Sequence, residues 1–276
     1  RSVNMTDKSD LHTKAMDFLL KTSRTFFIPI SYLPKGLQEG IGAAYLCMRA
    51  IDEIEDHPSL PADSKVSLLQ ALSELPDANF KEENLQKLFE PYKDELPEVT
   101  LFLSDWVEFC PPGAKDKVLE STKEMAEGMA KWVIKDWQIH NEEELDDYTY
   151  YVAGLVGVML SDMWNWYDGT ETDRELAIAF GRGLQTVNIL RNREEDAERG
   201  VNFYPDGWGF DEMFAHTERN LALADAYIEE IETKDIIQFC KIPLELAKAT
   251  LKALKEGKEK IDRATVTEIV SQVVEH

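Results

Sequence analysis

Apolar residues recur along the whole chain at steps of three and four, and runs of β-branched residues are scarce. This period gathers apolar side chains on one face of an α-helix, whereas a half-buried strand needs alternation at steps of two. Proline and glycine separate the helical segments at short intervals. The pattern predicts an all-α chain with helices at Leu11 to Phe27, Leu37 to Asp56, Ser64 to Leu75, Glu83 to Phe89, Val99 to Phe109, Lys115 to Gln138, Glu142 to Trp166, Asp173 to Asp196, Asn220 to Phe239, Leu244 to Ile261 and, peripherally, Val266 to His276.

Charge and composition exclude several classes of protein. The chain has 30 basic and 53 acidic residues, a net charge of −23, so it repels phosphate backbones and we expect no nucleic-acid partner. A hydrophobic share of 43% over 276 residues is enough for a packed core. No linker or fixed repeat is visible, so we expect one helical domain over residues 5–276, with Arg1 to Asn4 as a cloning remnant.

The expected setting is the cytoplasm. No segment approaches the roughly 20 uninterrupted apolar residues of a membrane-spanning helix, and no basic amphipathic anchor is evident, so membrane contact is at most peripheral. The three cysteines, Cys47, Cys110 and Cys240, are widely spaced and fit neither a disulfide framework nor a zinc site.

Four polar residues form a stripe on an otherwise apolar helix near the N-terminus. Tyr45, Arg49, Asp52 and Asp56 stand at positions i, i+4, i+7 and i+11, which places them along one helix face. An arginine and two carboxylates within an apolar helix are costly without a ligand or partner. Taken alone, this stripe is better explained as an acidic helix end that faces solvent.

A second stripe follows about 140 residues later. Gln185, Asn188, Asn192 and Asp196 stand at i, i+3, i+7 and i+11, again within an apolar helix. Two oxygen-bearing stripes that face each other would bind a hard divalent cation such as Mg²⁺, which completes its shell with water and substrate phosphate. The pairing of two such stripes, with a basic residue beside each, favours a diphosphate–metal site over two unrelated solvated helix ends.

Two aspartates and three histidines receive simpler interpretations. Asp63 and Asp173 precede helical segments and are expected to act as N-caps. His57, His140 and His216 lack metal-ligand spacing, and we expect each to be solvated or in a loop.

These residues give the chain a resemblance to a known family. In order and spacing it resembles the squalene/phytoene synthases, the head-to-head isoprenyl diphosphate synthases, over nearly its whole length. The residues that carry the resemblance are Ser23 to Phe26, Tyr45, Arg49, Asp52 with Glu55 and Asp56, Tyr148 to Gly157, and Gln185 with Asn188 to Arg191.

The resemblance implies a single-domain isoprenoid-synthase helical bundle around a central apolar cavity. It implies Mg²⁺ as the cofactor and an allylic prenyl diphosphate, such as farnesyl diphosphate, as the substrate. The implied metal ligands are Asp52, Asp56, Asn188 and Asp196, with Asn192 a weaker one. The residues implied to hold the substrate or stabilise its charge are Ser23, Tyr45, Arg49, Gln185 and Arg191 at the diphosphate, and Phe26, Tyr148, Val152 and Leu155 along the chain and its carbocation.

Two segments depart from the family pattern. The second motif usually reads D-x-x-x-D, and here it reads Asn192-Arg193-Glu194-Glu195-Asp196. Asparagine offers one neutral oxygen where aspartate offers two charged ones, so Mg²⁺ binding should weaken. In the last long helix, Leu251 stands where the family usually has tyrosine.

The departures bear on the fate of the carbocation. Condensation needs a second chain in near-attack geometry and exclusion of water, which a loosened motif would impair. We therefore expect a prenyl diphosphate hydrolase that releases farnesol and diphosphate. The first alternative is a head-to-head synthase that makes dehydrosqualene, squalene or phytoene, and the second is a non-catalytic prenyl-lipid-binding protein.

Overall fold

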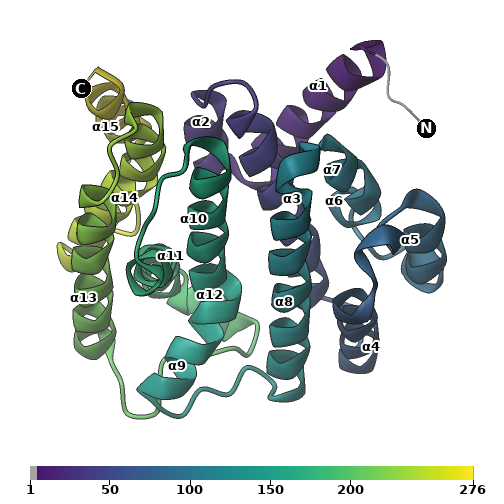
Figure 1. Ribbon diagram of the computed structural model, residues 1–276. Helices are drawn as coiled ribbons and strands as arrows, with labels where there is room; N and C mark the ends of the chain where they lie inside the picture. The colour runs from purple at the N-terminus through teal and green to yellow at the C-terminus, as the bar shows by residue number, and fades with distance from the viewer. Residues whose placement is uncertain (1–4, 276) are drawn as a thin grey trace. The chain divides into compact units, whose positions relative to one another are not determined.

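The computed structural model describes the backbone of residues 5–275 and the side chains of residues 8–275; the expected cloning remnant at residues 1–4 lies outside them. Every regular element in this part of the chain is a helix, which confirms the all-α prediction (Figure 1). The chain divides into two compact units, Arg1–Asp136 and Trp137–His276, which are described separately below. The single domain with a central cavity stays a prediction. No helix within residues 5–275 has the length and apolar character needed to cross a membrane.

The first unit is organised around helix α3. Its elements are α1 (Met5–Thr22), α2 (Arg24–Ser31), α3 (Leu37–Glu55), α4 (Ala62–Glu74), η1 (Asp77–Asn79), α5 (Glu82–Phe89), η2 (Glu90–Tyr92), α6 (Glu98–Leu101), α7 (Leu103–Phe109), η3 (Pro112–Ala114) and α8 (Lys115–Ile134). Helices α1, α6, α7 and α8 all pack against α3, while α4 packs along α8. This packing explains why α3 is apolar on nearly every side, because a helix surrounded by others must bury its whole circumference.

The predicted helix Leu11 to Phe27 is wrong in one respect, because the structure breaks it at Ser23. Ser23 has φ −143° and ψ 52°, outside the helical region, and precedes α2. The guanidinium of Arg49 donates a hydrogen bond to the carbonyl oxygen of Thr22. A carbonyl at the end of α1 is thus satisfied by a side chain from α3, which compensates for the interruption.

The second unit contains the remaining helices. They are α9 (Glu142–Thr149), η4 (Tyr150–Gly154), α10 (Leu155–Asp168), α11 (Arg174–Arg191), α12 (Arg193–Glu198), α13 (Phe210–Glu229), α14 (Lys234–Lys255) and α15 (Arg263–Glu275). Helix α11 packs against α13, α10, η4 and α14. Residues 142–168 run as one helical stretch, as predicted, but η4 inserts a turn of π-helix into it. Single π turns within α-helices are rare and frequently lie at functional sites.

Glycines allow a very close crossing of α11 with the η4–α10 segment. A Cβ added at Gly157 would lie 1.9 Å from the carbonyl oxygen of Ala177, and one added at Gly181 would lie 2.0 Å from that of Ala153. Both distances are far below any real contact, and the obstructing atoms are backbone. Only glycine therefore permits the two backbones to approach in this way.

Two predicted features of the helix boundaries are wrong. The expected break before Leu244 does not occur: α14 runs through Pro243, and the chain breaks after Glu229 instead. Pro243 and its neighbours are buried, so packing of this segment outweighs the hydrogen bond that proline removes. Asp63 lies inside the first turn of α4 and is not its N-cap, whereas Asp173 caps α11 by accepting a hydrogen bond from the Leu176 amide at 3.0 Å.

Candidate functional site

The first polar stripe lies on α3 as the spacing predicts. Tyr45 is buried, Arg49 and Asp52 are half-buried, and Asp56 is the exposed residue that follows the helix. Within α3, positions seven and eleven residues after Tyr45 return to the same face. The stripe therefore passes from the core of the first unit to its surface and ends in two carboxylates.

Asp52 has an electrostatic environment that disfavours its charge. Its Oδ1 atom is buried and has no hydrogen-bond partner among the described residues. Burial raises the pKa of the Asp52 carboxyl to about 7; the charge of Asp56 raises it further, and Arg49 acts in the opposite direction. A buried carboxylate oxygen without a partner is costly, so the site is incomplete in a way that a cation would correct.

The end of α3 adds to this need for positive charge. Asp52, Glu53, Glu55 and Asp56 lie in or directly after its last turn, which carries no basic residue. The C-terminal end of a helix has a partial negative charge, so carboxylates there are destabilising. Arg49 forms an ion pair with one of them, since its Nη1 lies 3.8 Å from the Glu53 carboxylate. Carboxylate oxygens gathered in this way are the ligands that Mg²⁺ prefers.

The segment around Ser23 joins this stripe within the first unit. The rings of Phe26 and Tyr45 lie 4.5 Å apart between centroids, tilted by 34°. The bond from Arg49 to Thr22 places the residue before Ser23 next to the same helix face. Ser23 and Phe26, predicted only by resemblance, thus lie beside the residues predicted from spacing.

The second polar stripe belongs to the second unit, and its helix is not continuous as predicted. Helix α11 ends at Arg191, Asn192 has φ −99° and ψ 10°, and α12 begins at Arg193. The amide of Asp196 still bonds to the Asn192 carbonyl at 2.8 Å, so the interruption is a single residue. Gln185 and Asn188 are half-buried, and Asp196 is 8% exposed.

Two arginines to which the sequence assigned no binding role make contacts at this motif, Arg199 with Asp196 and Arg193, a motif residue itself, with Tyr204. Arg199 donates from Nη2 to Oδ1 of Asp196 at 2.7 Å. The guanidinium of Arg193 lies 3.9 Å from the centroid of the Tyr204 ring. The spacing of Asp196 and Arg199 could have predicted their ion pair, because residues three apart lie next to each other on a helix.

The residues predicted to line the substrate chain in the second unit surround the π turn. Tyr148 is buried at the end of α9, and its ring stacks on Phe203 at 5.0 Å with an interplanar angle of 13°. Val152 is half-buried within η4, and Leu155, the first residue of α10, is buried. Phe203 was not predicted, because the 55 residues that separate it from Tyr148 carry no periodic signal. Arg191 is exposed in the last turn of α11.

The expectation that His216 is solvated or in a loop is wrong. His216 is 2% exposed within α13, and its Nε2 lies 2.8 Å from Oδ1 of Asp146 and 4.0 Å from Oε1 of Glu142. These three side chains have the atom spacing of a metal site. Arg182 lies 3.5 Å from Asp146 and Arg219 lies 3.0 Å from Glu142, so both carboxylates already have cationic partners. The cluster is best explained as a buried polar network that joins α9 to α13.

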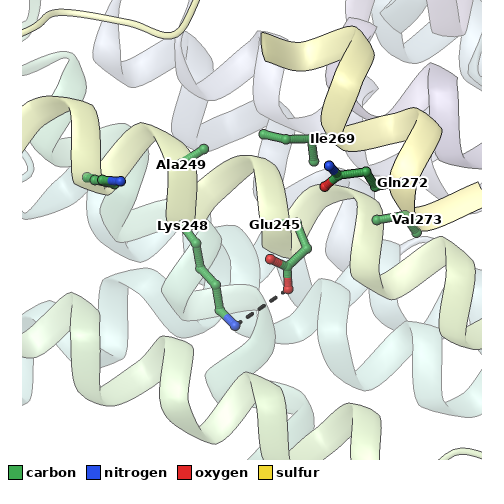
Figure 2. A pocket seen from close by; sticks show the side chains of 7 residues that line it. Glu245, Lys248, Ala249, Ile269, Gln272 and Val273 are labelled. Atoms are coloured by element: carbon green, nitrogen blue, oxygen red, sulfur yellow. Dashed lines mark ion pairs between the residues drawn. The ribbon is translucent and has the colours of Figure 1, made fainter. Parts of the chain in front are cut away.

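A hollow beside α14 contains none of the predicted ligands. Figure 2 shows Glu245, Lys248 and Ala249 of α14 opposite Ile269, Gln272 and Val273. Lys248 pairs with Glu245 at 3.5 Å and with Asp225 at 2.7 Å. The charges of Glu245 and Lys248 are therefore paired within the chain. Leu251, the departure noted in this helix, is buried.

Comparison with known proteins assigns the chain to a family. The family model for squalene/phytoene synthase matches residues 19–208. The squalene synthase of Schizosaccharomyces pombe is 27% identical over 264 residues, 84% of this chain and 57% of the relative. The Botryococcus squalene synthase of Botryococcus braunii is 35% identical over 184 residues, 64% of this chain and 38% of the relative. The chain thus spans less than two thirds of the length of these relatives.

Solved structures agree on the fold. A ligand complex of TcSQS superimposes with a TM-score of 0.74 at 22% identity, covering 96% of this chain and 86% of the other. A dehydrosqualene synthase bound to a ligand gives 0.68 at 20% identity, covering 98% and 97%. This is the helical isoprenoid-synthase fold that the sequence predicted. The family match covers both polar stripes and also the glycines of the close crossing, which lie between the stripes in the sequence. Because the match covers more than half of the chain, the chain belongs to the squalene/phytoene synthase family.

Proposed function

We propose that this protein is an Mg²⁺-dependent enzyme that ionises an allylic prenyl diphosphate, farnesyl diphosphate above all, and joins it head to head to a second one. The observation that carries the proposal is the buried, unpartnered oxygen of Asp52 at the acidic end of α3. In a member of this family, that oxygen is best explained as a ligand to the metal that holds the diphosphate.

The oxygen donors of each motif are of the kind that fits magnesium. Asp52 and Asp56 would hold it at the first motif, and Asn188 and Asp196 would do so at the second, with Asn192 contributing less. Mg²⁺ prefers such hard oxygen ligands and keeps part of its shell for water and phosphate. When bound, the metal would neutralise the charge that develops on the departing diphosphate.

The side chains around each motif would take the remaining charge of the diphosphate. Arg49 and Arg191 are the cations beside the two motifs, and Ser23, Tyr45 and Gln185 would donate hydrogen bonds to its oxygens. Such donors accelerate ionisation because they act where negative charge develops, on the oxygen that leaves with the electron pair of the C1–O bond.

Apolar and aromatic residues would protect the allylic cation that ionisation leaves. Phe26, Val152 and Leu155 offer no nucleophile, and the stacked pair of Tyr148 and Phe203 offers electron-rich ring faces to a positive charge. In condensation, the double bond of a second chain attacks the cation and a proton is lost; the diphosphate of the second chain must then also leave, with loss of a second proton, before the product is a hydrocarbon. In hydrolysis, water attacks the cation and then loses one of its protons, which leaves the alcohol.

The names of the relatives favour condensation, which reverses the order that the sequence departures suggested. The matched relatives and solved structures are named squalene or dehydrosqualene synthases. Hydrolysis to farnesol is the second candidate, favoured by Asn192 in the second motif and by the engagement of Asp196 with Arg199. These features reduce the charge available to metal on that side.

Product identification tests the proposal. The purified protein is incubated with farnesyl or geranylgeranyl diphosphate, with Mg²⁺ or with a chelator, and products are separated by chromatography. A C30 or C40 hydrocarbon that requires Mg²⁺ supports condensation, and farnesol or geranylgeraniol supports hydrolysis. Asp52→Asn should abolish either product, while Asp94→Asn, an exposed control in the same unit, should not. Binding without release of diphosphate would instead support a lipid-binding protein.

A further inference from the structure

Asp196 forms an ion pair with Arg199, which lies three residues later in the sequence. Nη2 of Arg199 lies 2.7 Å from Oδ1 of Asp196, with 11% of the Asp196 side chain and 52% of the Arg199 side chain exposed. The backbone reinforces the pairing, because the amides of Arg199 and Val201 both donate to the Asp196 carbonyl, at 3.1 and 2.9 Å. The carboxylate therefore lies in a mainly buried position with a positive charge already against it.

The two motifs differ in this respect. Asp52 has a buried oxygen with no hydrogen-bond partner in the described chain, and its helix end has no basic residue in the last turn. Asp196 has a short charge-assisted bond to Arg199. A divalent cation that binds Oδ1 of Asp196 must displace the Arg199 guanidinium, and the bond it breaks is among the stronger hydrogen bonds in proteins.

We propose that Arg199 is an internal counter-ion that competes with Mg²⁺ for Asp196 and so lowers the metal affinity of the second motif. The inference rests on the proposed function, since it assumes that Asp196 is a metal ligand. It adds a residue outside the motif that regulates metal occupancy. With Arg199 in place, the first motif fills at low metal concentration and the second only at higher concentration.

The charge of Arg199, not its shape, is the operative property. Lysine at this position keeps a cation within reach of Asp196, whereas glutamine keeps a side chain of similar length without charge. Lys248 supplies a control, because it is also partly exposed, also pairs with a carboxylate, at 2.7 Å, and lies in the same unit. A purely structural role for Arg199 would change stability without changing metal affinity.

Manganese binding tests the inference without any catalytic readout. Mn²⁺ is titrated into the full chain at constant ionic strength, and free Mn²⁺ is measured by electron paramagnetic resonance. We expect Arg199→Gln to lower the dissociation constant of the weaker site by up to about fivefold, the range of a partly exposed ion pair. Arg199→Lys and Lys248→Gln should match the wild type, and adding Asp196→Asn to Arg199→Gln should remove the gain.

The outcomes separate this inference from the proposed function. An unchanged or raised dissociation constant in Arg199→Gln, with Mn²⁺ still bound, would overturn the role of Arg199 alone. A gain that survives Asp196→Asn would overturn it as well, because the effect would not pass through that carboxylate. Absence of Mn²⁺ binding in the wild type and every variant at millimolar metal would overturn both this inference and the metal-dependent function.

Discussion

Asp52 is expected to lower the stability of the folded chain at neutral and alkaline pH. Its pKa rises from 3.8 to about 7, chiefly through burial. At about 1.36 kcal/mol per pKa unit, keeping Asp52 ionised costs the folded state up to ~4 kcal/mol. The gain from removing this charge is smaller than that limit, because part of the Asp52 side chain reaches solvent and asparagine is itself a polar group without a partner. We therefore expect Asp52→Asn to raise the free energy of unfolding by about 2 kcal/mol at pH 8.

The pH dependence gives the sign of the effect. Between pH 4 and 7 the folded chain keeps the Asp52 proton and the unfolded chain has released it, so this contribution to stability is lost as pH rises. Asp52→Asn removes the titration. Its advantage over the wild type should therefore be small at pH 5, grow through pH 7 and stay constant above it.

Urea unfolding followed by tryptophan fluorescence, at pH 5, 6, 7 and 8 with a chelator present, measures this difference. Asp94→Asn, on an exposed loop of the same unit, should follow the wild type throughout. Added Mg²⁺ should stabilise the wild type more than Asp52→Asn, because a ligand that binds the folded state shifts the equilibrium and the variant lacks one of the metal ligands. The reasoning fails if Asp52→Asn is no more stable than the wild type at pH 8, or if the difference does not grow with pH.

Three further predictions concern the second unit. Asn192→Asp restores a charged ligand and should shift the product mixture toward condensation in chromatographic assays; an unchanged mixture would remove Asn192 from the explanation. Gly154→Ala places a Cβ 2.9 Å from Cγ2 of Ile178 and should cost about 1–3 kcal/mol in thermal unfolding. Ile178→Leu lacks that methyl, so the double variant should recover much of the loss, and no recovery would refute the steric cause. His216→Ala leaves a buried network incomplete and should cost about 1–3 kcal/mol in urea unfolding, whereas the exposed His140→Ala should cost less than about 1 kcal/mol; equal costs would contradict the buried network.

The sequence predicted helix type and helix faces reliably because both depend on neighbours within one or two turns. The stripe from Tyr45 to Asp56 follows from a period of 3.6 residues alone, and the structure places it on α3. The cap at Asp173 is equally local, since the side chain bonds to an amide three residues later. The unsatisfied state of Asp52 was partly foreseeable, because two carboxylates in an apolar helix lack nearby cations other than Arg49.

Long-range partners required the tertiary structure. At the break before α2, the carbonyl of Thr22 is bonded by Arg49, 27 residues away, and buried His216 is bonded to Asp146, 70 residues away. The unbroken course of α14 through Pro243 reflects packing that outweighs a local preference. Spacing along the chain decides which side chains share a helix face, because helical geometry repeats at short range. Which side chains meet across helices depends on how whole helix faces pack. A local sequence pattern does not determine that packing, so it does not identify these partners.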